Sequence, residues 1–314
     1  MKKKRTLQKL VILFSSIALI ILPVSAMFNA EGLPFTPTAT GTINGEVQVF
    51  GTYGLKNPPI TLSFSLPRDP AYAVIYYGVW GGTERYTGWS MITVNNNPPR
   101  RTQLFGQDDM NQNVLESGNG VYFISEEATS LLHAGENVIT ATDSRGEAGS
   151  KIDGRIYGIW AVVAMENDGS ATTQYFLFEG NENLHGEGWA GKNPTRKNSC
   201  SIDIPALSLG PSARANLTVL TLCGTKGQPD YVTFNGNDLG APAQPANEYP
   251  PGARDIANEQ TGDANGGTGI SSRYVDMETF DVTSLIKSNN VVGFERGRDS
   301  NNDGKIATTG AAPE

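Results

Sequence analysis

The chain has 314 residues and a formal net charge of −8, and its 36 glycines and 18 prolines accompany only 18% charged residues. This composition is typical of many short strands joined by turns rather than of long surface helices. The acidic balance excludes a broad basic surface of the kind that binds nucleic acid or anionic lipid.

The N-terminus has the pattern of a secretory signal peptide. Residues 2–5 form a positive region, residues 10–22 an apolar region and residues 24–26 a small-residue cleavage site. An uncleaved membrane anchor is the alternative, but the apolar run before Pro23 is shorter than the roughly 20 residues that a span needs. No second apolar run of spanning length follows in the sequence. We therefore expect a secreted or cell-surface protein that lacks residues 1–26 and has no membrane span.

Removal of this segment makes the protein more acidic. It takes away no acidic residue, so the formal net charge changes from −8 to −13, and the basic residues lost are Lys2, Lys3, Lys4, Arg5 and Lys9. An acidic exported protein repels nucleic acid, and it tolerates or uses divalent cations.

One short phrase occurs twice in the mature chain. Residues 128–139 and 280–292 each place a polar start before an apolar pair, then a turn, then a β-branched run. Upstream of each copy lie an apolar run and a strand with asparagine at its tip, at 74–80 with 91–96 and at 217–224 with 231–237. The repeat is about 145–155 residues long, which fits one domain better than a solenoid unit.

These patterns predict an all-β protein with two tandem antiparallel β-sandwich domains of the jelly-roll type. We expect an extended N-terminal segment at 27–38, the first domain at 39–180 and the second at 181–314, with the border near Gly180. The strands expected in chain order lie at 40–53, 60–66, 72–80, 91–96, 121–124, 155–165, 172–178, 201–204, 216–222 and 231–237. Residues 240–269 lack periodicity and are predicted to form a long exposed loop.

The second domain is predicted to lack its last strand. In the first copy the repeated phrase leads through a loop into the apolar run 156–163, whereas in the second copy only residues 306–314 remain. One hypothesis is that a segment within residues 31–51 of a neighbouring subunit supplies the strand, which would join copies head to tail. The alternative is a truncated sequence.

Two features fit an extracellular location. Cys200 and Cys223 lie at the ends of strand-like segments on either side of a Gly-Pro turn, so we expect them to form a disulfide, with two free buried thiols as the alternative. The sequon at Asn216 opens a strand and is a candidate glycosylation site.

The loop at residues 82–89 is a candidate recognition loop. It places Glu84, Arg85, Tyr86 and Trp89 between glycines on a β-scaffold, where exposed aromatic side chains commonly bind sugars or partners. The alternative is a loop that caps the core, in which Trp89 simply packs.

A second candidate site is a calcium loop. Asp299, Asn301 and Asp303, followed by glycine, match the first half of an EF-hand loop. The second half fails, because Gly310 stands where a bidentate glutamate is needed, so calcium is a candidate ligand and an ordinary turn is the alternative.

Catalytic patterns are weak. The two histidines, His133 and His185, lie in different predicted domains and neither accompanies a nucleophile or a second metal ligand at suitable spacing. A pair of carboxylates, such as Glu84 or Asp108 with Glu126, could still meet in space and hydrolyse a glycoside. We expect a protein that is not an enzyme.

Two resemblances follow from these motifs. Residues 280–286 (FDVTSLI) followed by 290–292 (NVV) resemble the closing motif of galactose-binding-like jelly rolls. Residues 77–84 (YGVWGGTE), 86–89 (YTGW), 154–159 (GRIYGI) and 178–181 (FEGN) are similar to an uncharacterised domain family of secreted and cell-surface proteins of methanogenic archaea. The second resemblance covers nearly all of the chain after about Pro34, implies an envelope role and lends no catalytic residue.

The sequence therefore predicts a structural protein of a cell envelope, sheath or surface filament, whose partners are other copies of itself or other envelope proteins. The alternative is a carbohydrate-binding module or adhesin that binds glycans through Tyr86 and Trp89.

Overall fold

The computed structural model is built almost entirely from antiparallel strands. It describes residues 32–82, 87–106, 109–116, 120–184, 199–205, 210, 213–222, 231–239, 271–272 and 275–295. The all-β sandwich fold predicted from the sequence is confirmed.

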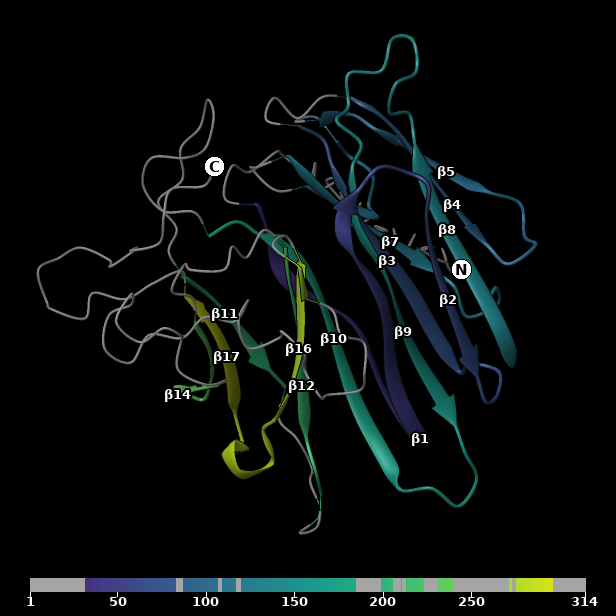
Figure 1. The fold of residues 1–314 in the computed structure, drawn as a ribbon. Helices are drawn as coiled ribbons and strands as arrows, with labels where there is room; N and C mark the ends of the chain where they lie inside the picture. The colour runs from purple at the N-terminus through teal and green to yellow at the C-terminus, as the bar shows by residue number, and fades with distance from the viewer. Residues whose placement is uncertain are drawn as a thin grey trace, which may run out of the picture.

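The first sandwich consists of two facing sheets (Figure 1). One has the strand order β10-β1-β9-β3-β7-β6, in which β10 is Thr172–Glu182, and the other has the order β2-β8-β4-β5. Their strands are β1 (Gly32–Lys56), β2 (Ile60–Leu66), β3 (Tyr72–Trp80), β4 (Gly88–Val94), β5 (Arg100–Leu104), β6 (Val114–Glu116), β7 (Val121–Glu127), β8 (Gly135–Asp143) and β9 (Ile156–Glu166).

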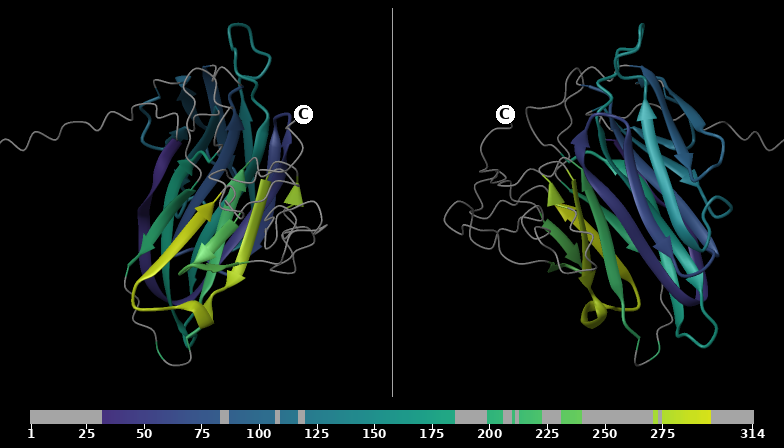
Figure 2. Two further views of the ribbon diagram at one scale, coloured as in Figure 1. Left: turned by 90° about the vertical axis from the view of Figure 1, so that its left-hand side faces the viewer. Right: turned by 45° about the vertical axis from the view of Figure 1, so that its right-hand side comes forward.

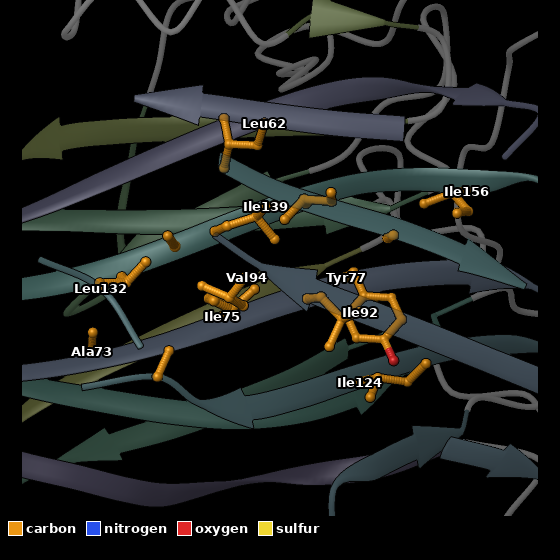
Figure 3. Packing of buried hydrophobic residues seen from close by; sticks show 14 of the residues in the cluster. Leu62, Ala73, Ile75, Tyr77, Ile92, Val94, Ile124, Leu132, Ile139 and Ile156 are labelled. Atoms are coloured by element: carbon orange, nitrogen blue, oxygen red, sulfur yellow. The ribbon is translucent and has the colours of Figure 1, made fainter. Parts of the chain in front are cut away.

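The core of this sandwich follows from the alternation of apolar side chains. Every second residue of β2 is buried, namely Leu62, Phe64 and Leu66, because successive side chains of a strand point to opposite faces. Figure 3 shows Ile75 of β3 and Ile139 of β8 among the buried side chains between the sheets. Burial of such side chains contributes about 1.5–3 kcal/mol each to folding.

The second sandwich has smaller described sheets, with the orders β11-β17-β13-β14 and β12-β16-β15. Val219, Phe234 and Val292 belong to the apolar cluster of this sandwich. The elements are β11 (Ser199–Ile204), β12 (Asn216–Leu222), β13 (Tyr231–Phe234), β14 (Asn237–Asp238), β15 (Ser271–Ser272), β16 (Val275–Asp281), the 3-10 turn η2 (Thr283–Leu285) and β17 (Asn290–Glu295).

The two sandwiches share an apolar layer. Strands β3 and β9 are buried on both faces, because their outer face is covered as well as their inner one. Tyr76 and Trp160 on that outer face cluster with Val275 and Met277 of β16. Figure 2 shows the green and yellow strands of the second sandwich lying beside the first.

Strand β1 changes partner in its middle. Residues from Gly32 to Asn44 pair with β10 (Thr172–Glu182), and residues from Gly45 to Lys56 pair with β9. The chain reaches β10 from β9 through a short turn, at the bottom of Figure 1. At the corner, the Asn167 N–H donates to the Asn44 carbonyl and the Gly45 N–H donates to the Ala171 carbonyl.

Glycine is required at this corner by close packing. A Cβ on Gly45 would lie 2.0 Å from the Met165 carbonyl oxygen, which belongs to the backbone and cannot move aside freely. The bend therefore depends on a residue without a side chain.

The N-terminal half of β1 departs from the sequence analysis. Residues 27–38 were expected to be an extended segment ahead of the first domain, but β1 begins at Gly32 and its Phe35 stacks on Phe294 of the second sandwich, with ring centroids 5.7 Å apart. Strand β10, which includes the strand expected at 172–178, pairs with this half of β1. The N-terminal half of β1 thus also contacts the second sandwich, and the expected border near Gly180 falls inside β10.

The repeated phrase forms the same hydrogen bonds in both sandwiches. Asn95 has a left-handed φ of 53°, its Nδ2 donates to Asn137 Oδ1, and its Oδ1 accepts from the Val138 N–H. Asparagine is among the residues that adopt this backbone conformation most readily. Asn137 in turn accepts from the His133 N–H and donates to the His133 carbonyl, which closes the turn before β8.

The second copy repeats each of these contacts. Asn235 also has a φ of 53°, donates to Asn290 Oδ1 and accepts from the Val291 N–H. Asn290 accepts from the Lys287 N–H and donates to the Lys287 carbonyl. We call each pair, Asn95 with Asn137 and Asn235 with Asn290, an asparagine lock.

The described strands of the two sandwiches differ in one respect. Strand β3 lies between β9 and β7, whereas β12, which follows the same plan, has only β16 beside it among the described residues. The strand predicted to be missing from the second domain would therefore pair with the edge of β12 that faces away from β16. The residues after Glu295 lie outside the described part.

We predict that Asn137→Ala lowers the free energy of unfolding by about 2–4 kcal/mol, because it removes a fully buried amide and leaves Asn95 and the backbone of His133 and Gly135 without their partner. Urea unfolding of the mature protein measures this. Thr61→Ala, which removes an exposed hydroxyl bond to Thr140, is the control and should cost less than about 1 kcal/mol. A loss below about 1 kcal/mol for the asparagine variant would show that the lock is dispensable.

Candidate functional site

The first sandwich carries its most distinctive surface chemistry around Trp89, near the start of β4. The indole Nε1 donates to Glu147 Oε2 at 2.9 Å, and the Arg101 guanidinium lies 4.5 Å from the ring centroid. The ring is half-buried. An aromatic ring held between an acid and a base is a rigid platform with polar groups at its rim.

The backbone around the ring is fixed by the loop after β8. The Trp89 N–H donates to Ser144 Oγ at 3.0 Å, and the Ser144 N–H donates to the Trp89 carbonyl at 3.0 Å. Ser144 Oγ also lies 2.9 Å from Ser150 Oγ, which ties the two sides of the loop together. The loop and the ring are therefore positioned together.

Ion pairs hold the base of the same loop. Asp153 accepts from Arg155 Nε at 2.7 Å and from Arg145 Nη1 at 3.2 Å. Arg145 also donates to the Asp153 carbonyl. Because these groups are partly exposed, each pair contributes little alone, but together they restrain residues 145–155.

Asp143 sits beneath this loop and is buried, with 6% of its surface exposed. Its Oδ1 accepts from the Arg145 N–H at 2.8 Å, whereas Oδ2 has no hydrogen-bond partner within the described part of the chain. Burial raises the pKa of Asp143 to about 6, and the hydrogen bond and charge of Arg145 offset this only in part. A Cβ on Gly154 would lie 2.6 Å from Oδ1, so glycine is needed there.

The loop that follows β5 is also held by hydrogen bonds. Asp109 is buried, accepts from the Phe105 N–H at 2.9 Å and accepts from the Asn111 N–H at 3.0 Å. Asn111 Nδ2 donates to the Gln103 carbonyl at 2.6 Å. Burial raises the pKa of Asp109 against these hydrogen bonds. The loop presents Phe105 and Met110 to solvent, with 50% and 58% of their surfaces exposed.

The sequence identified part of this region. Of the expected recognition loop, Trp89 is placed by the structure, whereas Glu84, Arg85 and Tyr86 lie outside the described residues. The partners Arg101 and Glu147 were missed, since they come from β5 and the loop after β8 and only the sheet register brings them to the ring. No sequence pattern indicated the Asp109 loop or its exposed pair, Phe105 and Met110.

The other expected sites are only partly described. Cys200 lies on β11, but Cys223 is outside the described residues, so their disulfide stays a prediction. Asn216 is exposed at the start of β12, where a glycan would have access. Thr218 of the same sequon lies 2.9 Å from Thr279 across the sheet, between the two hydroxyl oxygens.

The calcium hypothesis falls on residues that the structure does not describe, since Asp299, Asn301 and Asp303 lie beyond Glu295. Among the residues it does describe, no group of three or more His, Cys, Asp or Glu side chains is arranged to hold a metal ion. Calcium binding therefore stays a prediction.

The carboxylate hypothesis is equally limited. Glu126 pairs with Arg100 at 3.4 Å and accepts from Asn113 at 3.2 Å, whereas Glu84 and Asp108 lie outside the described residues. His133 is exposed and its Nδ1 lies 2.8 Å from the Ala134 carbonyl oxygen, and His185 is also outside the described part. Within that part, no helix has the length and apolar character of a membrane span.

The family assignment comes from a match over most of the chain. The model of a family described as "Protein of unknown function (DUF3344)" matches residues 29–311. The chain belongs to this family. The DUF3344 match includes both sandwiches and the region around Trp89, and no curated protein matches the chain.

Among solved structures, this DUF3344 protein is similar to an α-L-rhamnosidase of Streptomyces avermitilis complexed with L-rhamnose. The identity is 12%, the TM-score is 0.20, and the match covers 85% of this chain and 22% of the rhamnosidase chain. The protein thus spans about a fifth of that enzyme's length. A TM-score this low carries no argument about activity.

We predict that Asp143→Asn stabilises the protein at neutral pH. Because folding raises the pKa of Asp143, the native state keeps this proton longer than the unfolded state, and stability falls as pH rises from about 4 to about 6. The variant lacks this loss, so its advantage over wild type should grow across the same window, to about 1–2 kcal/mol at pH 7.5.

Thermal or urea unfolding at pH 4, 5, 6 and 7.5 measures the difference. Thr140→Ala, on the same strand without a carboxyl group, is the control and should show a constant offset from wild type. An Asp143→Asn curve parallel to that of wild type would disprove the buried, uncompensated charge.

Proposed function

We propose that this protein is a non-enzymatic structural component of a cell envelope, sheath or surface filament, and that it works outside the cell as an assembly of copies. The observation that carries the proposal is the apolar layer that the two sandwiches share. Tyr76 and Trp160 of the first sandwich cluster there with Val275 and Met277 of the second, so the sandwiches cannot separate without exposing these side chains to water. A chain linked in this way is suited to bear load.

Contacts between β10 and the first sandwich support this role. Tyr76 donates to Glu179 at 2.6 Å, and Asn181 donates to the carbonyls of Leu115 and Val121 at 2.7 and 3.0 Å. Burial raises the pKa of Tyr76, and the nearby Glu179 charge raises it further. The phenol therefore stays protonated and keeps donating over a wide pH range, as an envelope protein exposed to changing surroundings would need.

Strand addition remains one way for copies to join. Residues 32–51 pair with β10 and β9 in their own chain, so this segment can serve a neighbour only by leaving those partners. The receiving edge would be that of β12, which carries alternating side chains for a new strand. The extracellular location, the Cys200–Cys223 disulfide, glycosylation of Asn216 and the calcium loop belong to the same proposal.

We predict that the mature protein from Met27 forms concentration-dependent oligomers or filaments, because self-association is the proposed function. Light scattering after size-exclusion chromatography and negative-stain microscopy, with and without millimolar calcium, measure this. Deleting residues 27–44 should abolish association if strand exchange joins the copies, whereas deleting residues 27–31, which precede β1, should not. A monomer at all concentrations, with or without calcium, would refute the structural role.

A glycan-binding role is the second candidate, favoured by the geometry at Trp89. A half-buried indole with Glu147 and Arg101 at its rim offers an apolar surface for a sugar ring and polar groups for its hydroxyls. The rival to a structural role is thus an adhesin or carbohydrate-binding module that uses this platform.

We predict for this candidate that Trp89→Ala lowers glycan affinity at least about tenfold, since loss of the ring removes roughly 1.4 kcal/mol or more of contact. Binding to a glycan array, followed by calorimetry on any hit, measures this. Phe105→Ala, which removes an exposed ring elsewhere at the same end, is the control and should leave affinity unchanged. The absence of any hit with the wild-type protein would count against this candidate.

A further inference from the structure

One end of the first sandwich has the side chains of a protein interface. Trp89, Phe105 and Met110 lie near the start of β4 and the end of β5, which pair through Gly88 and Leu104, and Arg101 of β5 lies over the Trp89 ring. We call this surface the aromatic end. Tryptophan, phenylalanine, methionine and arginine are the residue types enriched in the centres of interfaces, and they are rarely left exposed together without a role.

The aromatic end is held in place before any partner arrives. Buried Asp109 fixes the loop that carries Phe105 and Met110, and Ser144 fixes the backbone of Trp89. A preformed apolar surface loses little conformational freedom on binding, which favours association.

Arg101 gives this end an available positive charge. Within the described residues its guanidinium forms no ion pair and contacts the Trp89 ring. Arg145 and Arg155, at the same end, both pair with Asp153, and Glu147 accepts a hydrogen bond from the Trp89 indole. The aromatic end therefore favours a partner surface that is acidic.

The opposite end of the same sandwich is acidic. Glu46, Glu136, Glu166 and Asp168 are exposed there, and within the described residues none of them forms an ion pair. We call these four residues the acidic end. The basic groups described nearby are Arg68, whose Nη1 donates to the Glu166 carbonyl, and the exposed imidazole of His133.

The sheet registers place the two surfaces at opposite ends. Strand β9 starts beside Lys56 and Val79 and finishes with Glu166 beside Gly45, and β8 starts at Gly135 and finishes with Asp143 beside Ser90. With 11 residues in β9, the ends are roughly 35 Å apart. The basic groups at one end of a copy therefore cannot pair with the acidic groups at its other end. They can pair with the acidic end of a second copy placed in line with the first.

On the premise of the self-association proposed above, we propose that the aromatic end docks onto the acidic end of a second copy of this chain. The contact joins two different surfaces, so it is heterologous and leaves an unused end on each side of every pair. Repetition of the contact adds copies in one direction, as a filament or a row in an envelope layer requires. Because the mature chain carries an excess of acidic residues, other contacts between copies are repulsive, and Arg101 selects this one.

The test is charge reversal with rescue in the full mature protein. Arg101→Glu alone, and Glu166→Lys with Asp168→Lys, should each raise the concentration for half-maximal association at least about tenfold, measured by light scattering or sedimentation. An equimolar mixture of the two variants should form mixed dimers, because one brings an acidic and the other a basic surface to the same contact. Lys287→Glu, an exposed reversal in the second sandwich, is the control and should associate like wild type.

The outcomes separate this contact from the broader proposal. If both variants assemble like wild type while circular dichroism and urea unfolding show them folded, the copies join elsewhere, and the docking contact is wrong although the structural role stands. If the wild-type protein stays monomeric at every concentration, both fail. Weakened variants without recovery in the mixture would also overturn the pairing of these two ends, and Phe105→Ser with Met110→Ser should weaken association independently of salt.

Discussion

The change of partner of β1 between Asn44 and Gly45 is the constraint on which the rest of the structure depends. In the first half the strand pairs with β10, and in the second half it pairs with β9, so it joins β10 to the sheet of the first sandwich. The corner needs glycine, since a side chain on Gly45 would strike the backbone of Met165. Three features depend on this corner. They are the buried outer face of β3 and β9, the contact of β10 with Tyr76, and the stacking of Phe35 on Phe294. The two copies of the repeat are therefore joined by buried apolar and aromatic side chains.

Within each copy, an asparagine lock stabilises the turn that leads into a strand, β8 in the first sandwich and β17 in the second. The same contacts recur from Asn95 with Asn137 to Asn235 with Asn290, down to the φ angle of the first member. Such a buried amide pair is favourable only when all its groups are satisfied, and here backbone donors and acceptors satisfy them. The repetition explains why asparagine recurs at the strand tips, a signal visible in the sequence whose purpose the sequence did not reveal.

Much of the fold could be predicted because local alternation decides it. The strands expected at 60–66 and 72–80 match β2 and β3, since each has a face that must be buried. Contacts between distant residues could not be predicted in the same way. The start of β1 at Gly32, the burial of Asp143 and the approach of Arg101 and Glu147 to Trp89 all depend on which strands become neighbours. The aromatic residue of the candidate site was thus predictable from its loop, whereas the charged partners that define its chemistry were not.

The large sequence separation between β1 and its partner β10 also affects how the protein folds. Thr36 and Glu179, bonded across the ladder, are 143 positions apart, so the N-terminal half of the strand is synthesised long before its partner exists. Non-local pairing of this kind slows folding and leaves an unpaired, extended segment for as long as β10 is absent. A chain that folded while still being made would hold that segment open to aggregation. The arrangement therefore favours folding that begins only after β10 has been synthesised.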